Sequence, residues 1–529
     1  MSPQQSRILF PALAAGILLT VILFTAGCTG TGASPSPQSA LENDISALTG
    51  GPQYANASLG IIVVDPATGT VLYESNADRA FVPGSTTKLF SAAAVLEAFG
   101  ADYRFVTPVY ATAVPDPAGR IEGNLVLVAS GDPDMGGRTL PDGTIAYTDL
   151  DHGDANSLGG AVLPPTDPLA GLNDLAMQVH RSGITQVSDV VIDDRLFETT
   201  DLGKTYVLSP IIINDNLIDI TITPSAAGTA PALAMRPETG AYRLVNRATT
   251  GPAGNPPAIS ITEEPAGTIV VSGTVASDAG PVNRTLPVGK PAVFARTLFI
   301  EALERQGVTV NAATTGDNPA VKLPAAGSYS GLRKVADLTS LPLSEDVRLT
   351  LKVSQNLHAD TYVLLVAKAS NKTGFYDGMM REGTILRSLG LDTRGISLGD
   401  GEGGVEEDRI SPRAAAQLLT LMGTRPYAAE YKDALPVLGV DGTLASSCTA
   451  GNPACGHVYA KTGTRASYDP LNNRGLLLGK SIAGYMDAKS GRHLVFAIFV
   501  NNVPFADIDD MMATGDDLGN IAGLIYEYY

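Results

Sequence analysis

Apolar residues in the first hundred positions follow two patterns with different periods. Residues 59–65 form a nearly continuous apolar run, residues 66–70 contain Pro, Gly and Thr, and residues 71–74 are again strand-like. This order predicts a β-hairpin whose first strand is buried. Residues 86–99 are rich in Ala and Leu and are followed by Gly100, which predicts a helix that ends at that glycine.

Between residues 101 and 334 the pattern changes to short apolar runs separated by turns that contain Gly and Pro. The runs predict strands at residues 124–128, 189–193, 217–222 and 267–271. One helix is predicted at residues 291–306, where Pro291 suits the first helical position. We therefore expect this segment to form one or two mostly-β modules.

The remainder of the chain mixes helical and strand patterns again. Residues 344–370 and 412–422 predict helices, and the apolar run at residues 493–500 predicts a buried strand. The chain is thus expected to combine helices and strands at both ends, with a strand-rich segment between them.

The first 27 residues have the features of an export signal. Arg7 is the only early charge, residues 8–26 are almost wholly apolar, and small residues precede Cys28. This arrangement resembles a lipoprotein signal, in which the cysteine is lipidated and becomes the first residue of the mature protein. An uncleaved transmembrane anchor and a cleaved secretory peptide are the alternatives, and all three place the rest of the chain outside the cytoplasm. Residues 28–42 are expected to form a flexible tether.

Composition excludes some functions and leaves others open. The 529 residues include 54 acidic and 36 basic side chains, which gives a net charge of −18. Nucleic-acid binding depends on Lys and Arg against phosphates, so no nucleic-acid partner is expected. The five histidines are not closely spaced with cysteines or with one another, so no metal site is expected. The sequence has no glycine-rich phosphate-binding loop with a lysine, and no cofactor is expected either. An extracytoplasmic location permits a disulfide between Cys448 and Cys455, and two free thiols are the alternative.

Three short motifs carry the candidate chemistry. They are Ser85-Thr86-Thr87-Lys88, Ser354-Gln355-Asn356 and Lys461-Thr462-Gly463-Thr464. A serine hydroxyl is a poor nucleophile until a base takes its proton. Residues three apart share a helix face, so Lys88 is expected beside Ser85. A lysine can act as the base only if burial or nearby positive charge lowers its pKa.

The second and third motifs would complete this site. A second hydroxyl, that of Ser354, could relay a proton, and the Asn356 side chain could hold the lysine and a substrate carbonyl. Lys461 follows a strand-like stretch, and a strand edge can pair with an extended peptide. The Lys461 charge and the neighbouring threonine hydroxyls could hold a carboxylate, while Gly463 allows close approach. A second Lys-Thr-Gly, at residues 372–374, ends a predicted helix and is set aside.

A rival serine motif lies at residues 395–399. Its Gly-Ile-Ser-Leu-Gly sequence matches the nucleophile elbow of α/β-hydrolases with Ser397 at the centre, and His457 or His493 could complete a triad. The elbow requires a helix after the serine. A glycine-rich loop at residues 400–404 follows instead, so we prefer Ser85.

At the three motifs, and at residues 131–133, 214–219 and 439–444, the chain resembles the D-alanyl-D-alanine carboxypeptidase/endopeptidases, which are class C low-molecular-mass penicillin-binding proteins. The resemblance implies an α+β fold. Residues 43–100 and 335–529 would form a transpeptidase-like catalytic domain with an antiparallel sheet flanked by helices. Residues 101–334 would be inserted as mostly-β domains.

The resemblance also implies roles for the motif residues. Ser85 would be the acylated nucleophile and Lys88 its base, Ser354 and Asn356 would shuttle protons and position substrate, and Lys461, Thr462 and Thr464 would hold the terminal carboxylate. Backbone N–H groups of Ser85 and Thr464 would form the oxyanion hole. The loop at residues 400–404 and the long stretch at residues 465–481 depart from the family pattern.

The implied function is release of a terminal D-alanine from peptidoglycan stem peptides that end in D-Ala-D-Ala. Cleavage of cross-links is a second implied activity, and β-lactams would be covalent inhibitors. The protein would be held at the membrane by a lipid on Cys28. Two alternatives stay open: a related D-amino-acid peptidase, esterase or amidase with another substrate, and a catalytically idle penicillin-binding envelope protein.

Overall fold

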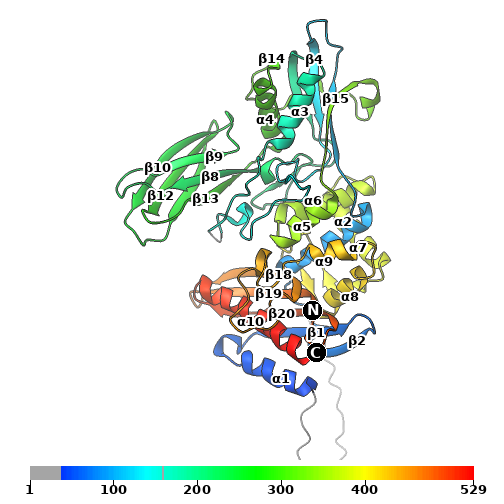
Figure 1. The fold of residues 1–529 in the computed structure, drawn as a ribbon, viewed down its shortest axis with the longest axis vertical. Coiled ribbons are helices and arrows are strands. Elements are labelled where there is room, and N and C mark those ends of the chain that lie inside the picture. The colour runs from blue at the N-terminus through cyan, green and yellow to red at the C-terminus, as the bar shows by residue number, and fades with distance from the viewer. Residues whose placement is uncertain (1–36, 158–159) are drawn as a thin grey trace, which may run out of the picture.

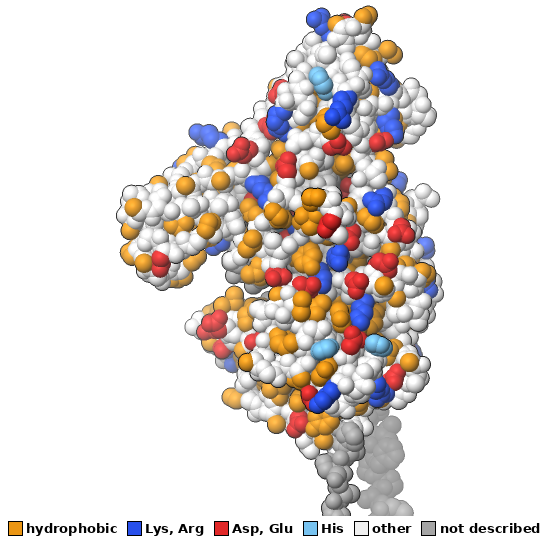
Figure 2. Space-filling view, in the orientation of Figure 1, with side chains coloured by type: hydrophobic (Ala, Val, Ile, Leu, Met, Phe, Trp, Pro, Cys, Tyr) orange, Lys and Arg blue, Asp and Glu red, His pale blue; other side chains and the backbone are white. Residues whose placement is uncertain are grey.

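The computed structural model describes residues 37–157 and 160–529. Figure 1 shows an elongated molecule in three parts. The core domain, at the bottom of the view, is built from both ends of the chain. The upper domain and a laterally projecting arm (residues 217–287) both come from the central segment. Figure 2 shows a deep notch between the arm and the core domain below it.

The core domain is built on an antiparallel sheet with the strand order β18-β19-β20-β1-β2. The strands are β1 (Ser58–Asp65), β2 (Thr70–Ser75), β18 (Val458–Asp469), β19 (Arg474–Asp487) and β20 (His493–Asn501), with the short β21 (Val503–Phe505) pairing with β19. Pairing of β1 with β20 joins the two ends of the chain. The predicted hairpin and the buried strand at residues 493–500 are therefore confirmed.

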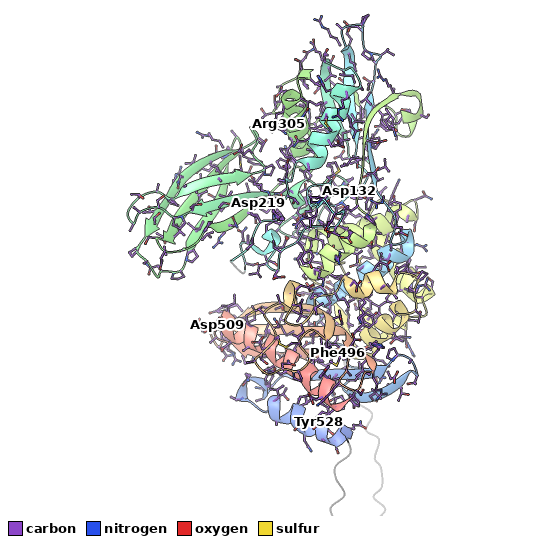
Figure 3. The ribbon with its side chains drawn as sticks, in the orientation of Figure 1. Asp132, Asp219, Arg305, Phe496, Asp509 and Tyr528 are labelled. Atoms are coloured by element: carbon purple, nitrogen blue, oxygen red, sulfur yellow. A yellow bond between two sulfur atoms is a disulfide. The ribbon has the colours of Figure 1, made fainter. Side chains whose placement is uncertain are left out.

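Both faces of this sheet are covered, which explains the unbroken apolar run in β20. Phe496, labelled in Figure 3, packs with Ile498 toward α1 (Pro37–Leu48) and α10 (Ile508–Tyr528). Ala497 and Phe499 belong to the core on the opposite face. Successive strand side chains point to opposite faces, so a strand buried on both sides has no polar positions.

The opposite face carries the remaining helices of the core domain. They are α2 (Lys88–Phe99), α5 (Leu343–Lys352), α6 (Asn356–Ala369), α7 (Phe375–Ser388), α8 (Pro412–Met422) and α9 (Ala428–Asp433). Helix α8 confirms the prediction at residues 412–422. The single helix predicted at residues 344–370 is wrong, because α5 and α6 are separate and meet at Ser354.

The upper domain contains a five-stranded sheet in the order β14-β5-β4-β3-β15. Its strands are β3 (Val106–Ala111), β4 (Arg120–Val128), β5 (Gln186–Asp193), β14 (Thr309–Val310) and β15 (Arg333–Thr339). Helices α3 (Ala170–Arg181) and α4 (Pro291–Arg305) share its core. Helix α4 confirms one prediction, whereas α3 was not predicted. The expected boundary at residue 334 falls inside β15, which completes this sheet by pairing with β3.

The arm consists of two three-stranded sheets. The first has the order β13-β8-β9, with β8 (Leu217–Thr223), β9 (Ala232–Arg236) and β13 (Val282–Pro287). The second has the order β10-β12-β11, with β10 (Arg243–Gly251), β11 (Ala258–Glu264) and β12 (Thr268–Ala276). Asp219, labelled in Figure 3, lies at the root of the arm, where it meets the rest of the molecule.

Two further features bear on the predictions. A disulfide joins Cys448 and Cys455 in the loop that precedes β18. Cys28 and the predicted export signal lie outside the described residues. Within residues 37–157 and 160–529, no helix has both the length and the apolar character that crossing a bilayer requires.

Candidate active site

Ser85 lies on a tight turn directly before α2. Residues Gly84–Thr87 form a 3₁₀ turn, and α2 begins at Lys88 rather than at residue 86 as predicted. Gly84 has a φ of +51°, and a Cβ there would lie 2.6 Å from the backbone nitrogen of Thr464. A glycine is therefore required where the serine turn meets β18. The turn leaves the Ser85 side chain partly exposed.

Lys88 is fully buried beneath this serine. Its Nζ atom lies 2.7 Å from Ser85 Oγ, 2.7 Å from Asn356 Oδ1 and 2.9 Å from the Glu402 carbonyl oxygen. Burial lowers the pKa of Lys88, although carboxylates led by Glu402 oppose the shift. The geometry therefore supplies the two properties that a serine-activating lysine requires, which are contact and a lowered pKa.

Ser354 occupies the break between α5 and α6. Its φ of +65° is unusual for a residue with a side chain. Gln355 caps α6, because its side-chain oxygen accepts a hydrogen bond from the Leu357 N–H at 3.0 Å. The break points the Ser354 hydroxyl toward Lys461 Nζ, which lies 2.9 Å from Ser354 Oγ.

The third motif lies on β18, the edge strand of the sheet. Burial and the nearby Lys88 charge hold the pKa of Lys461 well below its usual value. Thr462 and Thr443 share a hydrogen bond between their hydroxyls at 2.8 Å. A Cβ on Gly463 would lie 2.0 Å from the Pro83 carbonyl oxygen, so only glycine allows β18 to pack against the serine turn. The three sequence motifs therefore meet in one place.

The inserted segment contributes residues that the sequence analysis missed. Lys204 Nζ lies 2.6 Å from Asp360 Oδ2, 2.8 Å from Asp400 Oδ2 and 2.8 Å from Glu402 Oε1. Asp400 in turn accepts a hydrogen bond from the Gly403 N–H at 2.7 Å. The loop at residues 400–404 is thus fixed by a cation from the insert, and its Glu402 carbonyl contacts Lys88.

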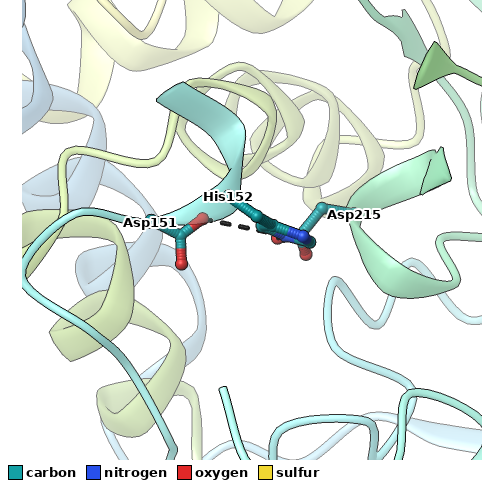
Figure 4. Close-up of side chains that lie close together, drawn as sticks. All are labelled: Asp151, His152 and Asp215. Carbon is teal, nitrogen blue, oxygen red and sulfur yellow. Dashed lines mark hydrogen bonds and ion pairs between the residues drawn. The ribbon is translucent and has the colours of Figure 1, made fainter. Parts of the chain in front are cut away.

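A buried ionic network joins the insert to the second motif. Figure 4 shows part of it, with His152 Nε2 close to Asp151 and 2.7 Å from Asp215 Oδ2. Gln355 Nε2 donates to Asp215 Oδ2 at 3.1 Å. Burial alone would lower the pKa of His152, but Asp219 and Asp151 raise it to about 10. The insert therefore helps to fix the residue that follows Ser354.

Neither acidic cluster resembles an open metal site. Asp151, His152 and Asp215 could by spacing hold an ion, as could Asp360, Asp400 and Glu402. Each cluster already holds a side-chain cation. Arg138 Nη2 lies 2.6 Å from Asp215 Oδ2, and Lys204 occupies the second cluster. These residues are better explained as internal ion pairs.

A cavity of about 290 Å³ adjoins the motifs. Ser354 and Asn356 line it from the core domain, and Asp154 and Tyr206 line it from the insert. Asp154 also acts electrostatically on Lys88 and Lys461, where it opposes the lowering of both pKa values by burial. No signal in the sequence places it there, because it is 69 residues from Ser85 in a segment predicted to be separate.

The alternative motifs lie elsewhere. Ser397 belongs to β16 (Ile396–Ser397), a two-residue strand that pairs with β17 (Arg409–Ile410) and is not followed by a helix. The second Lys-Thr-Gly falls between α6 and α7, where Gly374 is the cap residue of α7. Neither segment has the structure that its motif requires.

The chain is similar to known proteins over most of its length. The family model "D-Ala-D-Ala carboxypeptidase 3 (S13) family" matches residues 41–520. A D-alanyl-D-alanine carboxypeptidase from Actinomadura sp. (strain R39) is 32% identical over 511 residues, covering 92% of this chain and 85% of its own length. A penicillin-sensitive carboxypeptidase A from Dictyostelium discoideum is 26% identical, covering 84% of this chain and 83% of its own.

The crystal structure of penicillin binding protein 4 from Haemophilus influenzae matches with a TM-score of 0.68 at 19% identity, covering 92% of this chain and 99% of that one. This likeness confirms the predicted α+β penicillin-binding fold. The match at residues 41–520 covers most of the chain. The chain therefore belongs to the D-Ala-D-Ala carboxypeptidase 3 (S13) family of serine-type hydrolases.

Proposed function

We propose that this protein removes the terminal D-alanine from peptides ending in D-Ala-D-Ala, through an acyl-enzyme on Ser85. The observation that carries the proposal is the 2.7 Å contact between Ser85 Oγ and Lys88 Nζ, in a site where burial lowers the pKa of the lysine. A neutral lysine can accept the hydroxyl proton. A solvated helix turn would provide neither the contact nor the lowered pKa.

In the acylation step, Ser85 Oγ attacks the carbonyl carbon of the penultimate residue while its proton passes to Lys88 Nζ. The backbone N–H groups of Ser85 and Thr464 would stabilise the oxyanion. The C–N bond then breaks, and the proton that Lys88 accepted passes through the Ser354 hydroxyl, which Lys461 holds, to the leaving amine. Free D-alanine and a Ser85 ester result.

In the deacylation step, water attacks the ester, one proton returns to Ser85 Oγ, and the shortened peptide leaves as a carboxylic acid. The substrate would lie along β18 as an added strand, because β18 is the last strand in the sheet order. Its terminal carboxylate would contact Thr462 and Thr464. A cross-linked peptide could occupy the same edge, which supports endopeptidase cleavage as a second activity.

We further propose that the chain is a lipoprotein held outside the cytoplasm by a lipid on Cys28. The support is the sequence of residues 1–28, where an apolar run with a single early charge ends in small residues and a cysteine. An uncleaved anchor or a secreted form would place the enzyme in the same compartment. The mass of the mature N-terminal peptide separates the three, because only lipidation adds acyl chains to Cys28.

Incubation of the protein with a D-Ala-D-Ala peptide and, separately, with benzylpenicillin tests the proposed function. We expect release of D-alanine, and a protein mass increased by one penicillin with the adduct on the peptide that contains Ser85. Turnover of other amides or esters without D-alanine release would identify a related hydrolase. Stable acylation with no turnover would identify an idle penicillin-binding protein, and no adduct at all would refute acylation at this serine.

Gly403 provides a test of the packing around Ser85. It has a φ of +95°, and a Cβ there would lie 1.9 Å from the Gly84 carbonyl oxygen. Gly403→Ala should therefore displace the serine turn and slow acylation by about 100-fold, the loss typical of a 1 Å misplacement. Acylation by benzylpenicillin, followed by intact mass over time, gives the rate.

Gly390→Ala is the matched control. Gly390 has the same φ of +95° but no atom within 4 Å of the added Cβ. The control should cost about 1 kcal/mol of unfolding free energy through backbone strain and leave the acylation rate unchanged. Equal acylation rates in the two variants would show that the contact between Gly403 and Gly84 does not position Ser85.

A further inference from the structure

Lys480 carries an ammonium group to the edge of the third motif. In the β18–β19 pairing it stands directly opposite Thr464, and its Nζ donates to Thr464 Oγ1 at 3.0 Å. Cross-strand partners in an antiparallel pair place their side chains on the same face. The Thr464 side chain is exposed, whereas Lys480 is only partly so. The Lys480 ammonium group therefore holds the Thr464 hydroxyl from the neighbouring strand.

This ammonium group makes no direct ion pair within the described part of the chain. Burial lowers the pKa of Lys480 to about 8, and the Asp516 carboxylate on α10 acts on it electrostatically and opposes that shift. The buried Lys352 and the partly buried Lys432 both form ion pairs, with their Nζ atoms 2.6 Å and 3.3 Å from aspartate oxygens. Lys480 makes no ion pair of this kind among residues 37–157 and 160–529. Its stem packs on α10, where a Cβ on Gly515 would lie 3.0 Å from Lys480 Cε. A partly buried ammonium group whose hydrogen-bond partner is a neutral hydroxyl is stabilised when an anion binds beside it.

The other two ammonium groups of the site are already engaged. Lys88 contacts three oxygens beneath the serine, and Lys461 contacts the Ser354 hydroxyl and the Thr462 carbonyl oxygen at 2.9 Å each. Both are buried, and burial lowers the pKa of both. A carboxylate held by the threonine hydroxyls of β18 therefore needs its opposite charge from elsewhere.

We propose that Lys480 is a specificity-determining residue that favours substrates with a free C-terminal carboxylate. The Thr464 hydroxyl accepts a hydrogen bond from Lys480 and donates a hydrogen bond to the substrate carboxylate. The ammonium charge therefore acts on the carboxylate through one intervening hydroxyl. This inference rests on the proposed function and adds to it the group that selects an exopeptidase substrate. It assigns no new chemistry to the acylation step.

The experiment compares two reagents that share the same reactive β-lactam ring, one with a free carboxylate and one in which that carboxylate is a neutral methyl ester. Acylation rates with benzylpenicillin and with benzylpenicillin methyl ester are measured for the wild type, Lys480→Met, Lys480→Arg and the exposed control Lys489→Met. Lys480→Met should lower the second-order rate for the free acid by about 10- to 100-fold, as expected for loss of one charge-assisted hydrogen bond. It should change the ester rate by less than about threefold. Lys480→Arg should restore the preference for the acid, and Lys489→Met should alter neither rate.

Each other outcome has a definite meaning. Equal losses on acid and ester in Lys480→Met would assign Lys480 a structural role and overturn this inference while leaving the proposed function intact. An unchanged acid rate would also overturn it. Wild-type protein that neither reagent acylates would refute the proposed function and this inference together. Acylation of the wild type by at least one reagent thus tests the function, and the ratio of the two rates tests Lys480.

Discussion

Ser85→Ala should lower D-alanine release by about 10⁴- to 10⁶-fold, the range seen when a serine nucleophile is removed. The expectation follows from the geometry, because Ser85 Oγ is the hydroxyl in contact with the buried Lys88 Nζ. The substitution removes only one oxygen, from a side chain that is partly exposed. We therefore expect the melting temperature to change little, so the loss of activity will not reflect unfolding.

Ser397→Ala is the control for this prediction, because it removes the serine of the rival motif. Ser397 is exposed on the short strand β16, so its replacement should leave both activity and stability unchanged. Release of D-alanine by chiral detection and the mass of the β-lactam adduct are measured for both variants. A penicillin adduct on Ser85→Ala equal to that on the wild type would rule out Ser85 as the nucleophile.

The convergence of the three motifs could be predicted because acyl transfer sets strict demands on residue type. Ser85 and Lys88 are close in sequence, so a helical turn alone brings them together. Residues 354–356 and 461–464 are remote in sequence. They nevertheless offer a second hydroxyl, a carboxamide and a second ammonium group, which Ser85 and Lys88 do not provide. The resemblance of the three motifs to those of penicillin-binding proteins, together with the chemistry of their side chains, linked these segments before the fold was known.

The break at Ser354 could not be predicted from local sequence. Residues 344–370 contain neither Gly nor Pro, so nothing in them marks the end of a helix. The left-handed backbone of Ser354 is stabilised by tertiary contacts, namely the Lys461 ammonium on its hydroxyl and the Asp215 carboxylate on the Gln355 amide. Strain of this kind occurs at functional sites because the surrounding structure supports it.

The contribution of the insert was also beyond sequence reasoning. Lys204 meets Asp360 and Asp400 across 156 and 196 residues, and a lone lysine in a strand-rich segment is usually a solvated charge. In the fold it fixes the loop that supplies the Glu402 carbonyl to Lys88. The inserted segment is therefore part of the support of the active site, although its sequence predicts only separate modules.

Substitutions of Lys88 provide the second decisive test. They distinguish a lysine that acts as a base from one that only supplies a positive charge, because the two roles predict different acylation rates for Lys88→Arg. Lys88→Met should slow acylation by about 10³-fold or more, since it removes the proton acceptor for Ser85. Lys88→Arg should be nearly as slow, because a guanidinium stays protonated and cannot accept the proton. Retention of more than about a tenth of the wild-type rate in Lys88→Arg would contradict the role of Lys88 as base.

The pH dependence of stability gives an independent measure of the same lysine. Burial lowers the pKa of native Lys88 below 10.5, its value in the unfolded chain. Between these two pKa values the unfolded chain binds more protons, so the free energy of unfolding should rise with pH across this window.

Lys88→Met should lack this pH-dependent component of stability. The component is read as the difference between wild-type and variant denaturant curves at several pH values. The variant loses a buried amine whose protonated form is costly, but it leaves Asn356 Oδ1 and the Glu402 carbonyl oxygen without their donor. Because these two effects oppose each other, its stability at neutral pH should differ from that of the wild type by less than about 2 kcal/mol. Loss of activity with nearly unchanged stability would then locate the effect in the chemistry of Ser85.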